Sequence, residues 1–337
     1  MSSKGTASGV KAGAKRALRV GVLGAGVMGS NHARVLAGLP DITLVGVVDP
    51  LAAHRARATD MTGCRTFANF DELIAEGVDA VTIAAPTHLH HEIALACIAR
   101  NVHILVEKPI ASSVEEGREI VAAAERAGVT LMVGHVERFN PAVAAIKQAI
   151  SGEDILSIAI TRVGPFPPRM SNVGVVIDLA VHDIDLIRWF TESDIVEVQP
   201  QLSSAVAERE DIALLQFRTA SGVLAHINTN WLTPFKARNV TVATRGKYVM
   251  GDLLTRQVTE CFGFKPDGSY SMRHLPVGHD EPLRAELVAF VHAVRTGGVP
   301  AVTGDEGVAS LEIATRCLET PTRPASSARK GPRRVVG

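Results

Sequence analysis

The segment LRVGVLGAGVMGSNHARVLAGL, residues 18–39, joins an apolar run to an amphipathic one through three glycines. The pattern predicts a buried strand over residues 18–24 and a helix over residues 26–39. Glycines in a strand–turn–helix context let the backbone approach a pyrophosphate, and the helix N-terminus supplies N–H donors. The turn therefore predicts a dinucleotide site, with a purely structural turn as the alternative. The expected cofactor-binding residues of this turn are Gly24, Gly26, Val27, Met28 and Gly29.

The next predicted strand, residues 42–49, ends in an acidic residue at the position where dinucleotide-binding folds carry one. Asp49 follows Gly29 at close to the expected interval of about 20 residues. A carboxylate there accepts hydrogen bonds from the adenosine ribose and repels a 2′-phosphate. The sequence thus favours NAD over NADP, although Arg55 and Arg57 follow closely enough to compensate for that repulsion.

The rest of the chain divides into two patterns. Apolar strands at 78–86, 103–109 and 129–135, separated by helical segments, indicate a parallel sheet covered on both faces. After residue 150 the strands lengthen and alternate in polarity, which predicts a mostly antiparallel sheet. These later strands are expected at 155–164, 211–219, 222–232 and 239–252, with a last helix at 282–297.

The predicted fold class is therefore α/β, with an N-terminal Rossmann domain (a doubly wound parallel sheet) and a C-terminal α/β domain with a large, mostly antiparallel open sheet. The expected divisions are a flexible tail (1–17), an NAD-binding domain (18–137), a substrate-binding and oligomerisation domain (138–320) and a basic flexible tail (321–337).

Composition excludes several other classes of protein. The formal net charge of zero gives no attraction toward nucleic acid or anionic membranes, and no apolar stretch reaches the ~20 residues of a membrane span. The N-terminus lacks the apolar segment of a secretory signal. Four scattered cysteines without a C-x-x-C pair indicate a reducing compartment, and hence a cytoplasmic protein without a cysteine metal site.

Two predicted strand ends carry polar side chains where ligands bind in this fold class. The first, AAPTHLHHE, is expected to face the cofactor through Pro86, Thr87 and His90. Its three histidines raise the alternative of a metal site, but they do not share one face and no cysteine or paired acid completes the set. No metal site is predicted.

The second strand end, VEKPI, places Glu107 and Lys108 after an apolar strand and before Pro109. A lysine beside a nicotinamide can bind a substrate oxygen and stabilise its developing negative charge. An ordinary surface lysine is the alternative. We expect Glu107 to lie at the cofactor.

The helical segment DLAVHDIDLIRW, residues 178–189, contains an unusual set of ionisable residues. At about 100° per residue, Asp178, His182, Asp185 and Trp189 share one face. That spacing predicts a carboxylate that orients an imidazole for acid–base work, the alternative being a solvated acidic face. Asp183 falls among the core residues and should need a buried hydrogen-bond partner.

Taken together, GAGVMGSNHARVL, APTHLHHEIALACIA, VEKPIA and DLAVHDIDLIRW resemble the Gfo/Idh/MocA oxidoreductase family over residues 18–320. The resemblance implies that Lys108, Asp178 and His182 are catalytic. It also implies a cis peptide before Pro109 and an open sheet that forms oligomer contacts, in a homodimer or homotetramer.

Within the family, VGHVERFNPAV and NTNWLTPFKARNVTV look like the type that oxidises the 3-hydroxyl of UDP-N-acetylglucosamine, although Asn172 stands where that type is expected to have an acid. A nucleotide-sugar diphosphate needs cations. The expected substrate-binding residues are Arg138, Asn140, Arg162, Arg169 and Lys236, with Arg238 as a further cation. The alternatives are a dehydrogenase of an inositol or free sugar, and a non-catalytic dinucleotide-binding sensor.

Overall fold

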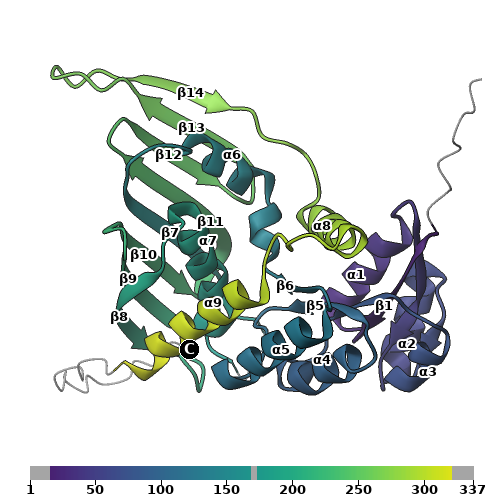
Figure 1. Ribbon diagram of the computed structural model, residues 1–337. Coiled ribbons are helices and arrows are strands. Elements are labelled where there is room, and N and C mark those ends of the chain that lie inside the picture. The colour runs from purple at the N-terminus through teal and green to yellow at the C-terminus, as the bar shows by residue number, and fades with distance from the viewer. Residues whose placement is uncertain (1–15, 168–172, 321–337) are drawn as a thin grey trace, which may run out of the picture.

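The protein folds around two sheets, seen side by side in the computed structural model (Figure 1). The structure describes residues 16–167 and 173–320. The predicted tail 321–337 lies outside the described residues, as does all of the predicted tail 1–17 except its last two residues. Of these, Arg16 bonds the carboxylate of Asp79 at 2.6 Å.

The first sheet is parallel and six-stranded, in the order β3-β2-β1-β4-β5-β6. Its strands are β1 (Leu18–Leu23), β2 (Ile42–Val48), β3 (Thr66–Phe67), β4 (Ala80–Ile83), β5 (His103–Glu107) and β6 (Leu131–Gly134). The intervening helices are α1 (Val27–Ala37), α2 (Ala52–Thr62), α3 (Phe70–Ala75), the 3-10 turn η1 (Thr87–Leu89), α4 (His90–Ile98) and α5 (Val114–Ala127). The strand order reverses between β1 and β4, so ligands are expected at the carboxyl ends there. The predicted Rossmann domain is confirmed.

The second sheet has eight strands in the order β14-β13-β12-β11-β7-β10-β9-β8. Within this sheet, β7 and β10 are the only parallel pair among the described residues. Its strands are β7 (Ile155–Pro165), β8 (Ile195–Ser203), β9 (Ile212–Thr219), β10 (Leu224–Asn230), β11 (Leu232–Thr244), β12 (Lys247–Asp252), β13 (Gln257–Phe262) and β14 (Ser271–Leu275). The helical segments around it are η2 (Val136–Phe139), α6 (Pro141–Ala149), the π-helix η3 (Val176–Ala180), α7 (Val181–Thr191), α8 (Pro282–Thr296) and α9 (Gly304–Glu319).

Side chains of the second sheet alternate between a covered and an open face, as β9 shows by burying every second residue. The predicted open, mostly antiparallel sheet is confirmed. Two details are wrong: α9 follows the helix that was expected to be the last, and the strand expected over 239–252 is the end of β11 plus β12. The chain turns between them because Thr244 Oγ1 accepts the backbone N–H groups of Gly246 and Lys247.

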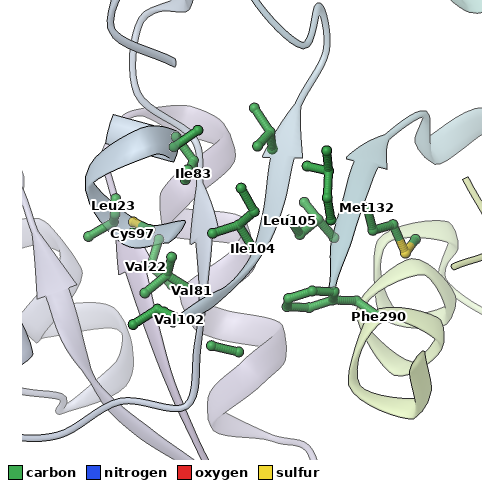
Figure 2. Close-up of a cluster of buried hydrophobic side chains, with 14 of the residues drawn as sticks. Val22, Leu23, Val81, Ile83, Cys97, Val102, Ile104, Leu105, Met132 and Phe290 are labelled. Carbon is green, nitrogen blue, oxygen red and sulfur yellow. The ribbon is translucent and has the colours of Figure 1, made fainter. Parts of the chain in front are cut away.

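The last two helices return to the first sheet, so the packing does not divide the chain at one point. Phe290 of α8 is fully buried in the core that holds Leu105 and Met132 (Figure 2). α9 begins at a capping box formed by Thr303 and Glu306. Both helices belong to the stretch 138–320 that the sequence assigns to the second domain. Those domain boundaries stay a prediction, and α8 packs with the first domain's core.

Across residues 16–167 and 173–320, no helix combines the length and hydrophobicity needed to cross a bilayer.

We predict that Phe290→Ala lowers the free energy of unfolding by about 3–5 kcal/mol, because it removes a buried ring and leaves a cavity between α8 and the sheet. Val288→Ala on the exposed side of the same helix, where the side chain is 43% exposed, should change it by about 0.5 kcal/mol or less. Urea unfolding measures both. Equal effects would show that α8 is not part of this core.

Candidate active site

The glycine turn after β1 has the geometry of a dinucleotide site. A Cβ on Gly29 would lie 1.8 Å from the carbonyl oxygen of Gly24, whereas nothing lies within 4 Å of a Cβ built on Gly26. Val27 and Met28 are 64% and 37% exposed in the first turn of α1. That helix has no side-chain cap and no acidic residue in its first turn. Its N–H groups and positive dipole end are therefore available to a pyrophosphate, so these residues fit NAD.

Asp49 lies beside this turn at the end of β2. Its carboxylate accepts the backbone N–H of Ala25 at 2.8 Å and of Leu51 at 2.9 Å. Burial alone would raise the pKa of Asp49, but these hydrogen bonds outweigh burial and hold it below its ordinary value. Arg55 and Arg57 donate to the backbone carbonyls of Asp49 and Ala25. Asp49 is thus held as an anion beside the glycine turn, and two nearby cations are engaged with backbone, which fits NAD better than NADP.

The segment after β4 contains three of the predicted cofactor-facing residues. Pro86 is exposed and Thr87 half-buried at the start of η1, next to the glycine turn. His90 instead is 1% exposed, with its ring nitrogens 2.9 Å from the carbonyl oxygens of Pro109 and Ala85. His90 therefore links the ends of β4 and β5, which gives it a scaffold position rather than a surface one.

Lys108 follows β5 and reaches across to the second domain. Its Nζ donates to the backbone oxygen of Asp178 at 2.6 Å and to Oδ1 of the same residue at 3.3 Å. The peptide before Pro109 is cis, as the resemblance implies. Glu107 is only 8% exposed and lies 3.0 Å from Nε2 of His32. Its carboxylate is thus turned into the protein, and an expected direct contact of Glu107 with the cofactor does not fit this placement.

Asp178 and His182 do not form the predicted pair. No hydrogen bond joins them among the described residues; the carboxylate of Asp178 bonds Lys108, and Nδ1 of His182 is enclosed without a partner. The reason is local geometry, because Asp178 lies in the π-helix η3 whereas His182 lies in the first turn of α7. A π turn bonds i to i+5 and shifts side chains out of i, i+4 register.

His182 nevertheless faces the same site as Lys108, and its surroundings favour a neutral ring. Burial lowers the pKa of His182 well below its ordinary value, and the charges of Lys108 and Arg162 lower it further. The ring packs edge-on against His135, with centroids 6.1 Å apart. His135 directly follows β6 and borders the site through this contact with His182, although the sequence did not single it out. With Nδ1 enclosed, Nε2 is the nitrogen of His182 that is left to accept a proton.

Two of the predicted substrate-binding arginines belong to the interior. Arg138 is 6% exposed and bonds both oxygens of Asp185, at 2.7 and 2.6 Å. Arg162 is 3% exposed, bonds Asp183 at 2.7 Å and bonds Glu137 at 2.8 Å. The expectation that they contact the substrate is corrected, because their guanidinium groups are occupied by buried carboxylates. The buried partner expected for Asp183 is confirmed.

The other predicted substrate residues lie in different settings. Asn140 is buried, caps α6 and donates to the carbonyl of Leu253, which is again a structural position. Lys236 is exposed on β11, so its ammonium group can reach a ligand. Arg169 and Asn172 lie outside the described residues.

Comparison with known proteins agrees with this geometry. Residues 18–135 match the oxidoreductase family with an NAD-binding Rossmann fold, and residues 156–249 match the GFO/IDH/MocA C-terminal domain. The chain belongs to the Gfo/Idh/MocA family. It is an NAD-dependent oxidoreductase, as the glycine turn and the resemblance predict.

Members of the Gfo/Idh/MocA family with different substrates resemble the chain. It is 32% identical over 237 residues to UDP-N-acetylglucosamine 3-dehydrogenase of Acidithiobacillus ferrooxidans, covering 70% of this chain and 74% of that protein. A structure of that enzyme has a TM-score of 0.83 at 28% identity, covering 89% of this chain and 96% of the other. Inositol 2-dehydrogenase of Rubrobacter xylanophilus is 31% identical, covering 89% and 90%.

The two later glycines of the turn should respond differently to alanine. We predict that Gly26→Ala keeps the melting temperature but weakens NAD binding at least about tenfold, or about 1.4 kcal/mol, because the new methyl group enters open space at the helix N-terminus. Gly29→Ala should lower both the melting temperature and the affinity for NAD, since its Cβ meets the Gly24 carbonyl oxygen. Calorimetric titration with NAD and thermal unfolding measure this. Unchanged NAD affinity in Gly26→Ala would contradict the site.

We also predict that the acid limb of the kcat–pH profile lies below about pH 6.5, the ordinary pKa of histidine. His182 has a lowered pKa, so the neutral form that accepts a proton persists as the pH falls. The steady-state rate of NAD reduction, measured across pH with saturating substrate, gives this limb. A midpoint above the ordinary histidine value would show that another group is the base.

Proposed function

We propose that this protein oxidises the 3-hydroxyl of UDP-N-acetylglucosamine, or of a related nucleotide sugar, to a ketone. The observation that carries the proposal is the juxtaposition of a lysine ammonium group and a neutral imidazole. Lys108 is held by Asp178, and its charge acts on His182. A cation beside a neutral base is what removal of a hydroxyl proton requires.

In this proposal each residue has one role. NAD, when bound, accepts the hydride from the sugar carbon. His182 takes the hydroxyl proton at Nε2, and Lys108 donates a hydrogen bond to the same oxygen and stabilises its growing negative charge. Asp178 positions the lysine through its backbone oxygen and its carboxylate.

The nucleotide-sugar substrate is supported by resemblance and by one placed cation. The enzyme of A. ferrooxidans, named for UDP-N-acetylglucosamine, aligns with this chain over most of both structures. Lys236 is exposed on β11, the strand that pairs with β7. Arg138, Arg162 and Arg238 are each bonded to a buried carboxylate. Among the predicted cations in the described residues, this leaves Lys236 to bind a diphosphate.

An inositol is the second candidate substrate. The inositol 2-dehydrogenase of R. xylanophilus matches nearly the whole of both chains, and a ring hydroxyl would use the same lysine and histidine. A homodimer or homotetramer formed through the open sheet, and a cytoplasmic location, stay predictions.

We predict that UDP-N-acetylglucosamine supports NAD reduction with a kcat/KM at least about tenfold above that of myo-inositol, about 1.4 kcal/mol in transition-state binding. Lys108→Ala and His182→Ala should each lower kcat by about 10²-fold or more, because each removes a group that acts on the reacting oxygen. Absorbance of the reduced cofactor measures all of these rates.

Lys236→Ala should raise KM for the nucleotide sugar and leave myo-inositol unaffected, which separates the two substrates in one variant. If myo-inositol gives the higher kcat/KM, an inositol replaces the nucleotide sugar as the proposed substrate. If Lys108→Ala and His182→Ala both keep near-normal turnover while binding NAD, the catalytic scheme is wrong.

A further inference from the structure

Behind Lys108, three ionisable side chains from distant parts of the chain meet in the interior. His32 comes from α1, Glu107 from the end of β5 and Glu286 from the middle of α8. They are 0%, 8% and 0% exposed. One ligand-type atom of each lies within 4.8 Å of the others. The described chain thus buries two carboxylates close together, one of them in the residue that precedes the proposed catalytic lysine.

The two carboxylates are bonded very differently. Glu107 Oε1 lies 3.0 Å from Nε2 of His32, and its Oε2 accepts the backbone N–H of Lys108 at 3.2 Å. Both oxygens of Glu286 are enclosed and have no hydrogen-bond partner within the described residues. Glu107 is therefore tied directly to the Lys108 peptide, whereas Glu286 has no cation or donor to compensate a charge.

The charged groups around the cluster do not change this imbalance. α8 packs on α1 and on η2. From α1 and β5, His32 and Glu107 approach Glu286, and the charge that acts on its carboxyl group is that of Glu107. In η2, Glu137 bonds Arg162 and Arg238, and Arg138 bonds Asp185 and Glu306.

Two carboxylates this close in a dry interior do not both ionise. Burial would raise the pKa of Glu107, but the hydrogen bond with His32 and the charge of Lys108 hold it below its ordinary value. Burial, together with the negative charge of Glu107, raises the pKa of Glu286 well above its ordinary value. Both directions agree with the bonding pattern.

We propose that Glu107 and Glu286 hold one proton between them, that it resides on Glu286, and that Glu286 is thereby a positioning residue for Lys108. A neutral Glu286 leaves Glu107 as the single anion, free to hold the Lys108 peptide and the His32 ring together. An ionised Glu286 would repel Glu107 and displace the peptide that carries the catalytic ammonium group. The kinetic consequence rests on the proposed function; the protonation of Glu286 does not.

A bound divalent cation is the competing explanation for a His–Glu–Glu cluster. The proton is favoured because a metal site with three protein ligands keeps an open position for water, whereas these three side chains are at most 8% exposed. Glu107 is also already bonded on both oxygens. Metal content of the purified protein decides between them: stoichiometric zinc, manganese or iron by mass spectrometry would overturn the proposal, and its absence supports a proton.

The central test compares wild type with Glu286→Gln in urea unfolding from about pH 5 to pH 8. Glutamine mimics the protonated acid. Glu286 keeps its proton in the folded protein and loses it in the unfolded chain above about pH 4.3, so rising pH favours unfolding of the wild type but not of the variant. The folding equilibrium constant of Glu286→Gln relative to wild type should therefore rise by up to about tenfold per pH unit. Glu125→Gln, exposed on α5, is the matched control and should show a flat ratio.

A kinetic arm tests the positioning role. Wild-type kcat should fall at alkaline pH where Glu286 ionises, and this limb should be absent from the pH profile of Glu286→Gln. Glu107→Gln should lower kcat at least about tenfold at neutral pH, because its amide nitrogen cannot accept a hydrogen bond where Glu107 accepts from both His32 and the Lys108 peptide. A flat pH ratio for Glu286→Gln, or loss of its folding at neutral pH, would overturn the proposal. If wild type oxidises neither UDP-N-acetylglucosamine nor myo-inositol, the proposed function fails while the unfolding comparison still decides the protonation.

Discussion

Two buried ion pairs fix the helix that carries the proposed base. Arg162 of β7 bonds Asp183, and Arg138 of η2 bonds Asp185, with all four side chains at most 6% exposed. Removing one partner of such a pair typically costs about 3–5 kcal/mol, because the other charge stays buried alone. The pairs therefore allow one rotational setting of α7. That setting directs His182 toward the end of β5, where Lys108 arrives from the first domain.

The sequence predicted what depends on local pattern. The glycine turn, the parallel strands and the core position of Asp183 all follow from periodicity and spacing, and the structure agrees with them. The bonding partner of Asp178 could not be predicted from the sequence, because a helical wheel assumes a constant rotation per residue. The π-helix η3 breaks that assumption, and the bond that Asp178 makes instead joins it to Lys108, 70 residues away.

Burial was the second property that the sequence did not reveal. Arg138 and Arg162 look in sequence like cations available to a phosphate, and only the fold shows that each faces a buried carboxylate. Glu286 gave no signal because its neighbours His32 and Glu107 come from the opposite end of the chain. α9 was missed for a different reason. Its capping box, Thr303 and Glu306, is a local signal, but the amphipathic pattern of the preceding helix was interpreted as the last helix of the chain.

The same charges that hold the scaffold also set the chemistry. A neutral imidazole is needed to accept a hydroxyl proton, and a nearby carboxylate would instead favour the charged ring. In this site the carboxylate of Asp178 is taken by Lys108, and that of Asp183 by Arg162. Burial therefore lowers the pKa of His182 most, and the nearby cations lower it further, with little opposition from the acids of its own helix. An Asp178–His182 pair would have raised the pKa of the ring and made it a stronger base. The displacement of Asp178 by the π turn, and its capture by Lys108, therefore keep His182 neutral to lower pH, while leaving it a weaker base than the predicted pair would have been.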